Sequence, residues 1–216
     1  MYDAIIKHID AFSVEFDCDI YTNSVTTEFL DDFIIYLEDQ GLRHNTIVGY
    51  IQKIQTLVRR AVMYNFAVDN TYNEIDLETE PTNAVFLSMN EITRIYYYKF
   101  VNQDKRMAKE RIRDLFVLGC FTALRYSDYS TLTAENLQDR YIVKRTKKTN
   151  VDVKVPAHDY VLEIFAKYHG CIPCKLCIQY FNKYLKVIMK EIGITDKITY
   201  SFTKGGRLQT VTKEKW

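Results

Sequence analysis

The sequence contains few residues that break helices and no long apolar stretch. Its 216 residues include only 3 prolines and 7 glycines, which argues against a turn-rich β-sandwich and favours helices. No apolar run approaches the roughly 18 residues of a membrane-spanning helix, so no membrane partner is expected. The first residues, MYDAIIKHIDAF, lack the basic start and long apolar segment of a secretory signal. The five cysteines are an odd number, which with the missing signal predicts a reducing, cytoplasmic location.

Charge is divided unevenly along the chain, although the net charge is only +1. Residues 1–85 carry 5 basic and 15 acidic side chains, whereas residues 86–216 carry 24 basic and 13 acidic ones. This asymmetry predicts two domains and an anionic partner for the basic one. Within the acidic part, residues 40–68 contain lysine and arginine but no acid, which leaves a positive stripe suited to a phosphate backbone.

Hydrophobic spacing predicts two consecutive helices within residues 1–83. The first begins at Thr27 and stops at Gly41, where glycine suits a left-handed conformation. The second has Asn45 as its expected N-cap and runs to about residue 65. Its opposite face is small, hydroxylated and basic, which suits either an anionic backbone or plain solvent. The expected apolar face consists of Ile47, Tyr50, Ile51, Ile54, Leu57, Val58, Ala61 and Val62, and the opposite face of Thr46, Gly49, Lys53, Thr56 and Arg60.

A polar, acidic and aperiodic stretch follows at residues 69–83 and predicts a linker. Ser88 and Glu91 have the spacing of a capping box at the start of a new helix. Val151, Val153 and Val155 alternate with polar side chains, which predicts a strand of a β-hairpin whose turn is basic. No further helix or strand is expected at the end of the sequence. The segments expected in this half are an apolar helix around 115–124, strands at 141–146 and 151–155, and helices at 159–168 and 176–192.

Two segments of the basic half resemble motifs of the tyrosine recombinase, or phage integrase, family. The segment FTALRYSDYSTLTAENL resembles the family's first arginine box, with Arg125 followed by Asp128 and Leu132. Ala123 stands where the family usually has glycine. The segment RTKKTNVDVKVPAH resembles the family's β-hairpin, in which a lysine directly precedes a threonine, and this lysine is Lys148.

Two further segments extend the resemblance over nearly the whole chain. LEDQGLRHNTIVGYIQKIQTLVRRAV resembles the DNA-contacting part of the family's core-binding domain, and FNKYLKVIMKEIGI resembles the helix before the second arginine box. The resemblance implies a mainly α fold with a small antiparallel β-hairpin or sheet, in two domains. An all-helical, SAM-like core-binding domain would span residues 1–83, and an incomplete α+β catalytic domain would span residues 84–216.

The family resemblance implies site-specific recombination, in which a tyrosine hydroxyl cleaves a DNA strand through a 3′-phosphotyrosine link and the strand is then rejoined. Arg125 would hold the phosphoryl oxygens of the transition state, Lys148 would protonate the leaving 5′-oxygen, and Asp128 would support the site. No cofactor is needed. The implied partner is double-stranded DNA, with a homo-oligomer of the full-length protein on that DNA, in a bacterial or phage-type cytoplasm at the nucleoid. The implied DNA-contacting residues are Arg43, His44, Asn45, Thr46, Lys53, Arg60, Arg145 and Lys147.

The family's second arginine box, His-x-x-Arg, has no counterpart in these residues. None of the four histidines is followed three residues later by arginine. No tyrosine therefore follows such a box, and the 17 tyrosines are interpreted as core and surface aromatics. We expect a recombinase truncated within its catalytic domain, which binds DNA but lacks the nucleophile.

Two alternatives remain open. The first is a non-catalytic DNA-binding regulator or remnant that occupies recombinase sites. The second is a metal-binding module, because Cys171, Cys174 and Cys177 form a C-x-x-C-x-x-C run with His169 nearby, a spacing that suits zinc or part of an iron–sulfur cluster. A single cluster without a second distant pair favours reduced thiols over a metal site.

Overall fold

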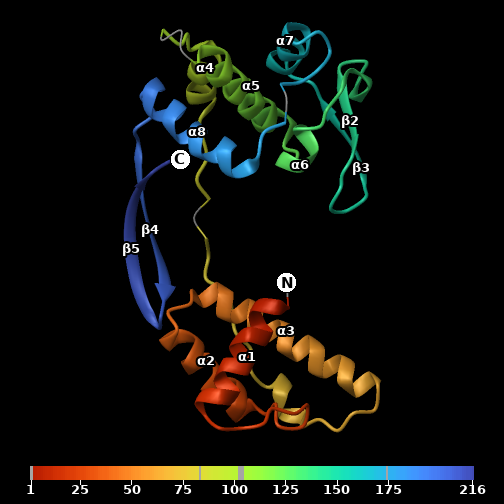
Figure 1. Ribbon diagram of the computed structural model, residues 1–216, viewed down its shortest axis with the longest axis vertical. Coiled ribbons are helices and arrows are strands. Elements are labelled where there is room, and N and C mark those ends of the chain that lie inside the picture. The colour runs from red at the N-terminus through yellow and green to blue at the C-terminus, as the bar shows by residue number, and fades with distance from the viewer. Residues whose placement is uncertain (1, 83, 102–104, 174) are drawn as a thin grey trace. The chain divides into compact units, whose positions relative to one another are not determined.

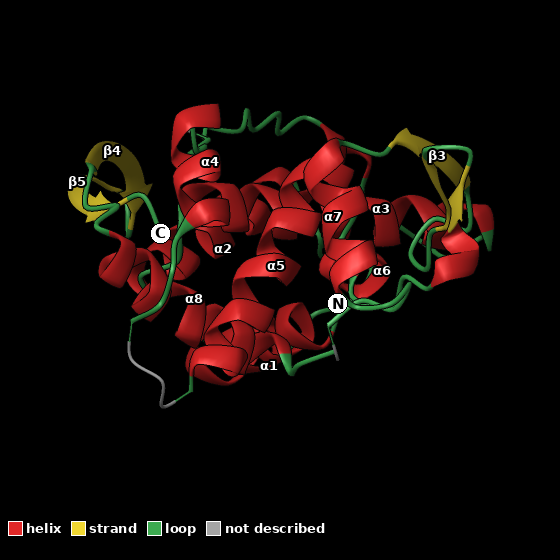
Figure 2. Cartoon of the chain, turned by 90° about the horizontal axis from the view of Figure 1, so that it is seen from above, coloured by secondary structure: helices red, strands yellow, loops and turns green. Residues whose placement is uncertain are grey.

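Helices dominate the computed structural model, and its strands are confined to two small sheets (Figure 2). The structure describes residues 2–82, 84–101, 105–173 and 175–216. By its contacts the chain divides into two compact units, Met1–Ala84 with Thr199–Thr212, and Val85–Ile198 with Lys213–Trp216. Residues 199–212, which the sequence analysis assigned to the second domain, therefore group with the first unit. Asn83, the predicted end of the first domain, lies outside the described residues.

The first unit is built around an aromatic core. Phe12 meets Phe33 edge to face with ring centroids 5.4 Å apart, and Phe33 stacks on Tyr36 at 5.8 Å. A helix at residues 3–15 was not predicted, although Ile5 and Phe12 bury one face of this helix in the core. The helices of this unit are α1 (Asp3–Glu15), α2 (Thr27–Asp39), α3 (His44–Met63) and the 3-10 helix η1 (Asn70–Asn73) (Figure 1).

Helix α3 begins two residues earlier than predicted and turns a slightly different face to the core. Arg43 is its N-cap, and Asn45 lies inside the first turn because its side chain bonds elsewhere, as described below. Leu57 and Val62, which were predicted to be in the apolar face, are 41% and 44% exposed. They lie at the edge of the buried face, which consists of Ile47, Val48, Ile51, Ile54 and Val58.

The second unit surrounds helix α5, which packs against α4, α7 and α8. The predicted capping box is confirmed at the start of α4, where Ser88 and Glu91 bond each other's backbone amides. Gly119 allows close packing inside the unit, because a Cβ there would lie 2.9 Å from ring carbons of Tyr129. The helices are α4 (Met89–Tyr97), α5 (Arg106–Thr122), α6 (Tyr126–Tyr129), the 3-10 helix η2 (Ala134–Asn136), α7 (Asp159–Lys167) and α8 (Ile178–Ile192).

The predicted β-hairpin is present in the second unit as part of a three-stranded antiparallel sheet. Strands β1 (Leu137–Gln138), β2 (Tyr141–Arg145) and β3 (Asp152–Pro156) lie in that order. The register pairs Ile142 with Val155 and Lys144 with Val153. The predicted fold class, mainly α with a small antiparallel sheet, is confirmed. No helix among the described residues has both the length and the apolar character needed to cross a membrane.

A second hairpin corrects the expectation that no closing element follows α8. Strands β4 (Lys197–Lys204) and β5 (Arg207–Glu214) form a two-stranded sheet. The Gly205–Gly206 turn between them has φ values of 57° and 65°, a conformation that glycine adopts without strain. A glycine pair flanked by alternating side chains is a hairpin signal, so the sequence contained the necessary information.

Candidate functional site

Arg125 and the β2–β3 hairpin border one cavity of about 490 Å³ in the second unit. Arg125 is the N-cap of α6, and its side chain is exposed. Lys148 lies in the turn between β2 and β3, next to the lining residue Thr149, and is also exposed. The structure therefore brings the arginine box and the hairpin turn to the same surface. The cavity is lined by Ala123, Leu124, Arg125, Asp128, Thr146, Thr149, Val151 and Val153.

Asp128 connects the arginine box to the hairpin turn. Its side chain is fully buried, and Oδ1 accepts a hydrogen bond of 3.0 Å from the backbone N–H of Lys147. Oδ2 has no hydrogen-bond partner among the described residues. A buried carboxylate in this position fixes the backbone immediately before Lys148.

The hairpin turn is also closed by its own side chains. The Thr146 and Thr149 hydroxyl oxygens are 2.7 Å apart, and Thr146 Oγ1 donates to the Val151 carbonyl at 3.1 Å. Asn150 has a left-handed φ of 54°, and its Oδ1 accepts from Arg145 Nε at 2.7 Å. These contacts give the turn a defined shape. The sequence did not predict this role of Thr146 and Thr149, because nothing in the local pattern distinguishes them from ordinary turn residues.

The basic residues of the hairpin differ in how they are held. Arg145 is exposed and has an ion pair of 3.8 Å with Asp152, a separation worth little at a solvated surface. The side chain of Lys147 is exposed, whereas its backbone N–H bonds to Asp128. Lys144 is half-buried, and its Nζ donates to the Thr131 carbonyl at 3.0 Å, so it connects strand β2 to the segment that follows α6.

Ala123 ends α5 in the left-handed region with a φ of 53°. A residue with a Cβ in this conformation is strained by roughly 1–2 kcal/mol, and glycine is not. This geometry gives a physical reason for the glycine that the resembling family usually has at this place. The strained backbone at Ala123 lies two residues before Arg125.

Tyr126 and Tyr129, which follow Arg125 within a few residues, pack in or against the core of the second unit. The Tyr126 hydroxyl donates to the Leu176 carbonyl at 2.8 Å, and burial raises its pKa. Burial also raises the pKa of Tyr129, whose ring packs against Gly119. Burial therefore disfavours the phenolate form of both side chains.

Two of the predicted DNA-contacting residues at the start of α3 bond to the chain that follows η1. His44 Nε2 is 2.9 Å from the Glu78 carbonyl oxygen. Asn45 Nδ2 donates to the Glu80 carbonyl at 2.9 Å, and Asn45 Oδ1 accepts from the Glu80 N–H at 2.8 Å. The polar groups of Asn45 are thus engaged within the protein, and this pairing explains why Asn45 is not the N-cap.

The remaining residues of that α3 face form an open surface. Thr46 and Arg60 are exposed, and Lys53 is half-buried with Nζ 5.6 Å from the Tyr50 ring centroid. A Cβ added at Gly49 would meet no atom within 4 Å. This face has the small and basic character that the sequence predicted, and neighbouring elements leave it uncovered at Gly49.

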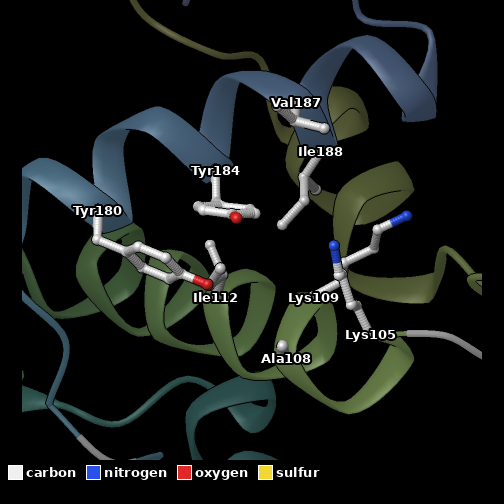
Figure 3. A pocket seen from close by; sticks show the side chains of 8 residues that line it. All are labelled: Lys105, Ala108, Lys109, Ile112, Tyr180, Tyr184, Val187 and Ile188. Carbon is white, nitrogen blue, oxygen red and sulfur yellow. The ribbon is translucent and has the colours of Figure 1, made fainter.

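A second cavity, of about 480 Å³, lies between α5 and α8. Tyr180 and Tyr184 project from α8 toward Ile112 and Lys109 of α5 (Figure 3). The centroids of the two tyrosine rings are 4.2 Å apart, and the rest of the lining combines aliphatic side chains with Lys105 and Lys109. None of the residues predicted for catalysis or DNA contact lines it.

The cysteine run has no completed metal site among the residues that the structure covers. Cys171 and Cys177 are free and exposed, and Cys174 lies outside the described residues. No group of three or more histidine, cysteine or acidic side chains suited to a metal occurs in the described ranges. The metal-binding alternative stays a hypothesis without structural support.

Comparisons with known proteins agree with the sequence motifs. Residues 1–78 match the family model described as the phage integrase SAM-like domain. A lambda integrase tetramer bound to a Holliday junction is similar, with a TM-score of 0.66 at 16% identity over 90% of this chain and 60% of that one. A lambda integrase bound to DNA gives a TM-score of 0.61 at 13% identity over 89% and 71% of the two chains. None of the curated proteins compared with the chain matches it.

The family model supports the resemblance over residues 1–78, which match a phage integrase SAM-like domain. At 16% identity, the likeness to lambda integrase shows a shared fold, and this chain spans 60% of the length of the first of those structures.

Proposed function

We propose that this chain, whose first domain is a phage integrase SAM-like domain, binds double-stranded DNA and carries the first half of a tyrosine recombinase active site. Its reaction class would be site-specific DNA cleavage and rejoining through a 3′-phosphotyrosine. One observation carries the proposal: Asp128 holds the turn of Lys148 at the cavity that Arg125 lines. The shared fold with lambda integrase structures that contain DNA supports it.

The proposed roles follow from the chemistry of phosphodiester cleavage. Negative charge develops on the phosphoryl oxygens, and the forked donors of Arg125 suit two such oxygens. The Lys148 ammonium can give a proton to the leaving 5′-oxygen, a role worth typically 10²–10⁴-fold in rate. Asp128 is fully buried, so it acts as a positioning residue for the turn.

We assign direct phosphate contacts to Thr46, Lys53 and Arg60 of α3, and to Arg145 and Lys147 of the hairpin. Each of these side chains is exposed or half-buried. His44 and Asn45 take a supporting role in the proposal, because they bond to the backbone at residues 78 and 80. A homo-oligomer on DNA, in a nucleoid-associated cytoplasmic location, is the corresponding assembly. Two lambda integrase structures, a dimer and a tetramer on DNA, support that part of the proposal.

The proposal also limits what these 216 residues do. They contain no His-x-x-Arg box, and no tyrosine follows such a box. We therefore assign no nucleophile to any tyrosine of the chain. The same observation favours the second candidate function, a DNA-binding regulator without cleavage activity.

A nicked suicide duplex tests both parts of the proposal on the same protein. We expect the chain to retard the duplex on a native gel and to form no covalent band on a denaturing gel. Absence of duplex binding would contradict the proposed function. A covalent band that survives denaturation would show that one of the tyrosines attacks DNA and would contradict the assignment without a nucleophile.

A further inference from the structure

The turn between β4 and β5 packs on the loop that leads into α3, within the first unit (Figure 1). The Gly205 N–H donates to the Leu42 carbonyl at 3.0 Å. Arg43 pairs with Lys204 in an antiparallel bridge. A segment near the end of the sequence therefore reaches the beginning of the predicted DNA-contacting helix, which no sequence pattern indicated.

Further contacts give this junction a defined geometry. The Arg43 guanidinium lies over the Phe202 ring, 4.1 Å from its centroid. The Thr203 N–H donates to Glu80 Oε2 at 3.0 Å, and the backbone of Glu80 is held by Asn45. The junction is thus fixed by backbone, aromatic and carboxylate contacts together.

Glycine is required on the inner side of the turn. A Cβ at Gly206 would lie 3.0 Å from Glu38 Oε2, and one at Gly205 would lie 3.1 Å from the Glu38 carbonyl oxygen. Both glycines also have positive φ. The turn therefore packs directly against the C-terminal end of α2. This contact fixes the backbone of the two residues that flank the turn, Lys204 and Arg207.

The junction brings together three basic side chains, although the unit around it is acidic. Arg43, Lys204 and Arg207 are exposed. Among the described residues, neither Lys204 nor Arg207 forms an ion pair with an acid. Two acids contact this hairpin: Glu38 lies under the turn, and the Glu80 carboxylate accepts from the Thr203 N–H. The β4–β5 turn thus adds two cations next to the positive stripe of residues 40–68.

We propose that Arg43, Lys204 and Arg207 form a phosphate-binding site for the backbone of duplex DNA. This inference rests on the proposed DNA binding and adds a contact from the β4–β5 turn that the sequence motifs do not include. Arginine and lysine side chains contact the phosphates of DNA. Such contacts position a protein on the duplex without reading the base sequence.

The salt dependence of duplex binding tests the site, because each phosphate contact adds about 0.9 to the slope of log K against log salt. Fluorescence anisotropy with a mixed-sequence duplex gives this slope between about 50 and 200 mM salt. Lys204→Ala and Arg207→Ala should each reduce the affinity loss over this range by about 3.5-fold, and the double variant by about 12-fold. Lys7→Ala removes the same charge from an exposed position on α1 and should leave the slope unchanged.

The outcomes separate this site from the function on which it rests. Binding by the unchanged chain, with the slope reduced in the double variant and retained in Lys204→Arg and Arg207→Lys, supports the site. Binding with an unaltered slope in the double variant overturns the site alone, as does an equal effect of Lys7→Ala. Absence of binding by the unchanged chain overturns the proposed function as well. Circular dichroism of each variant verifies that the helices are intact.

Discussion

The two regions proposed to contact DNA use the polar residues of their motifs differently. In the second unit, Asp128 is buried and holds the hairpin turn, while Arg125 stays exposed at the cavity. In the first unit, the polar groups of Asn45 bond to residue 80, and neighbouring Thr46 stays exposed. Both regions therefore contain a supporting residue beside residues free to bind a ligand. In both regions a motif position identifies the site, whereas the hydrogen bonds of each side chain separate a supporting residue from a contacting one.

The largest effect that distinguishes support from contact is expected at Asn45. Asn45→Ala removes two hydrogen bonds to the backbone of Glu80, so the first unit should lose about 2 kcal/mol of stability. Hydrogen exchange of the slowest α3 amides, followed by mass spectrometry, measures this loss.

Thr46→Ala is the matched control, because Thr46 is adjacent and exposed. It should change the free energy of unfolding that the slowest α3 amides report by less than about 0.5 kcal/mol. Equal protection of these amides in both variants would show that Asn45 has no supporting role.

A smaller effect is expected at Asp128. Asp128→Ala removes the acceptor of the Lys147 N–H, and we expect a loss of about 1 kcal/mol together with faster exchange of that amide. Asp128→Asn keeps an acceptor oxygen and should retain most of the protection. NMR-detected hydrogen exchange reports the amide directly. Unchanged exchange at Lys147 in Asp128→Ala would show that the carboxylate does not hold the turn.

The smallest effect is a gain of stability at Ala123. Ala123→Gly relieves the strain of the left-handed backbone at the end of α5. Glycine also raises the conformational entropy of the unfolded chain, so the net gain in the free energy of unfolding should be about 0.5–1 kcal/mol. Urea denaturation monitored by the single tryptophan, Trp216, which packs against the second unit, measures it. A loss of stability would mean that the Ala123 backbone is not strained.

The sequence predicted those elements whose signals are local. The alternation of Val151, Val153 and Val155 indicated the hairpin strand, and Gly193 ends α8 with a φ of 79°. Helix α1 was missed, because its buried face rests on a few residues and is recognised only when α2 supplies the partner surface. The β4–β5 hairpin was missed although Gly205 and Gly206 signal it, because its charged ends resembled an unstructured tail.

The candidate site was predicted from motif order, and the structure adds its supporting contacts. Arg125 and Asp128 both line one cavity. Thr146 and Thr149 close the turn through their hydroxyls, and no spacing rule indicates such a pair. The position of Lys204 beside Arg43 depends on tertiary packing between distant segments, so no local pattern reveals it.

Duplex binding by charge-reversal variants of α3 tests the central claim most directly. Lys53→Glu and Arg60→Glu reverse charges on the open face of α3, and each should weaken binding about tenfold, which corresponds to about 1.4 kcal/mol. Lys7→Glu changes the charge of the same unit by the same amount on α1 and should have a much smaller effect. Fluorescence anisotropy at one fixed, low salt concentration gives the three affinities. Equal affinities for the three variants would contradict the assignment of the α3 face to DNA.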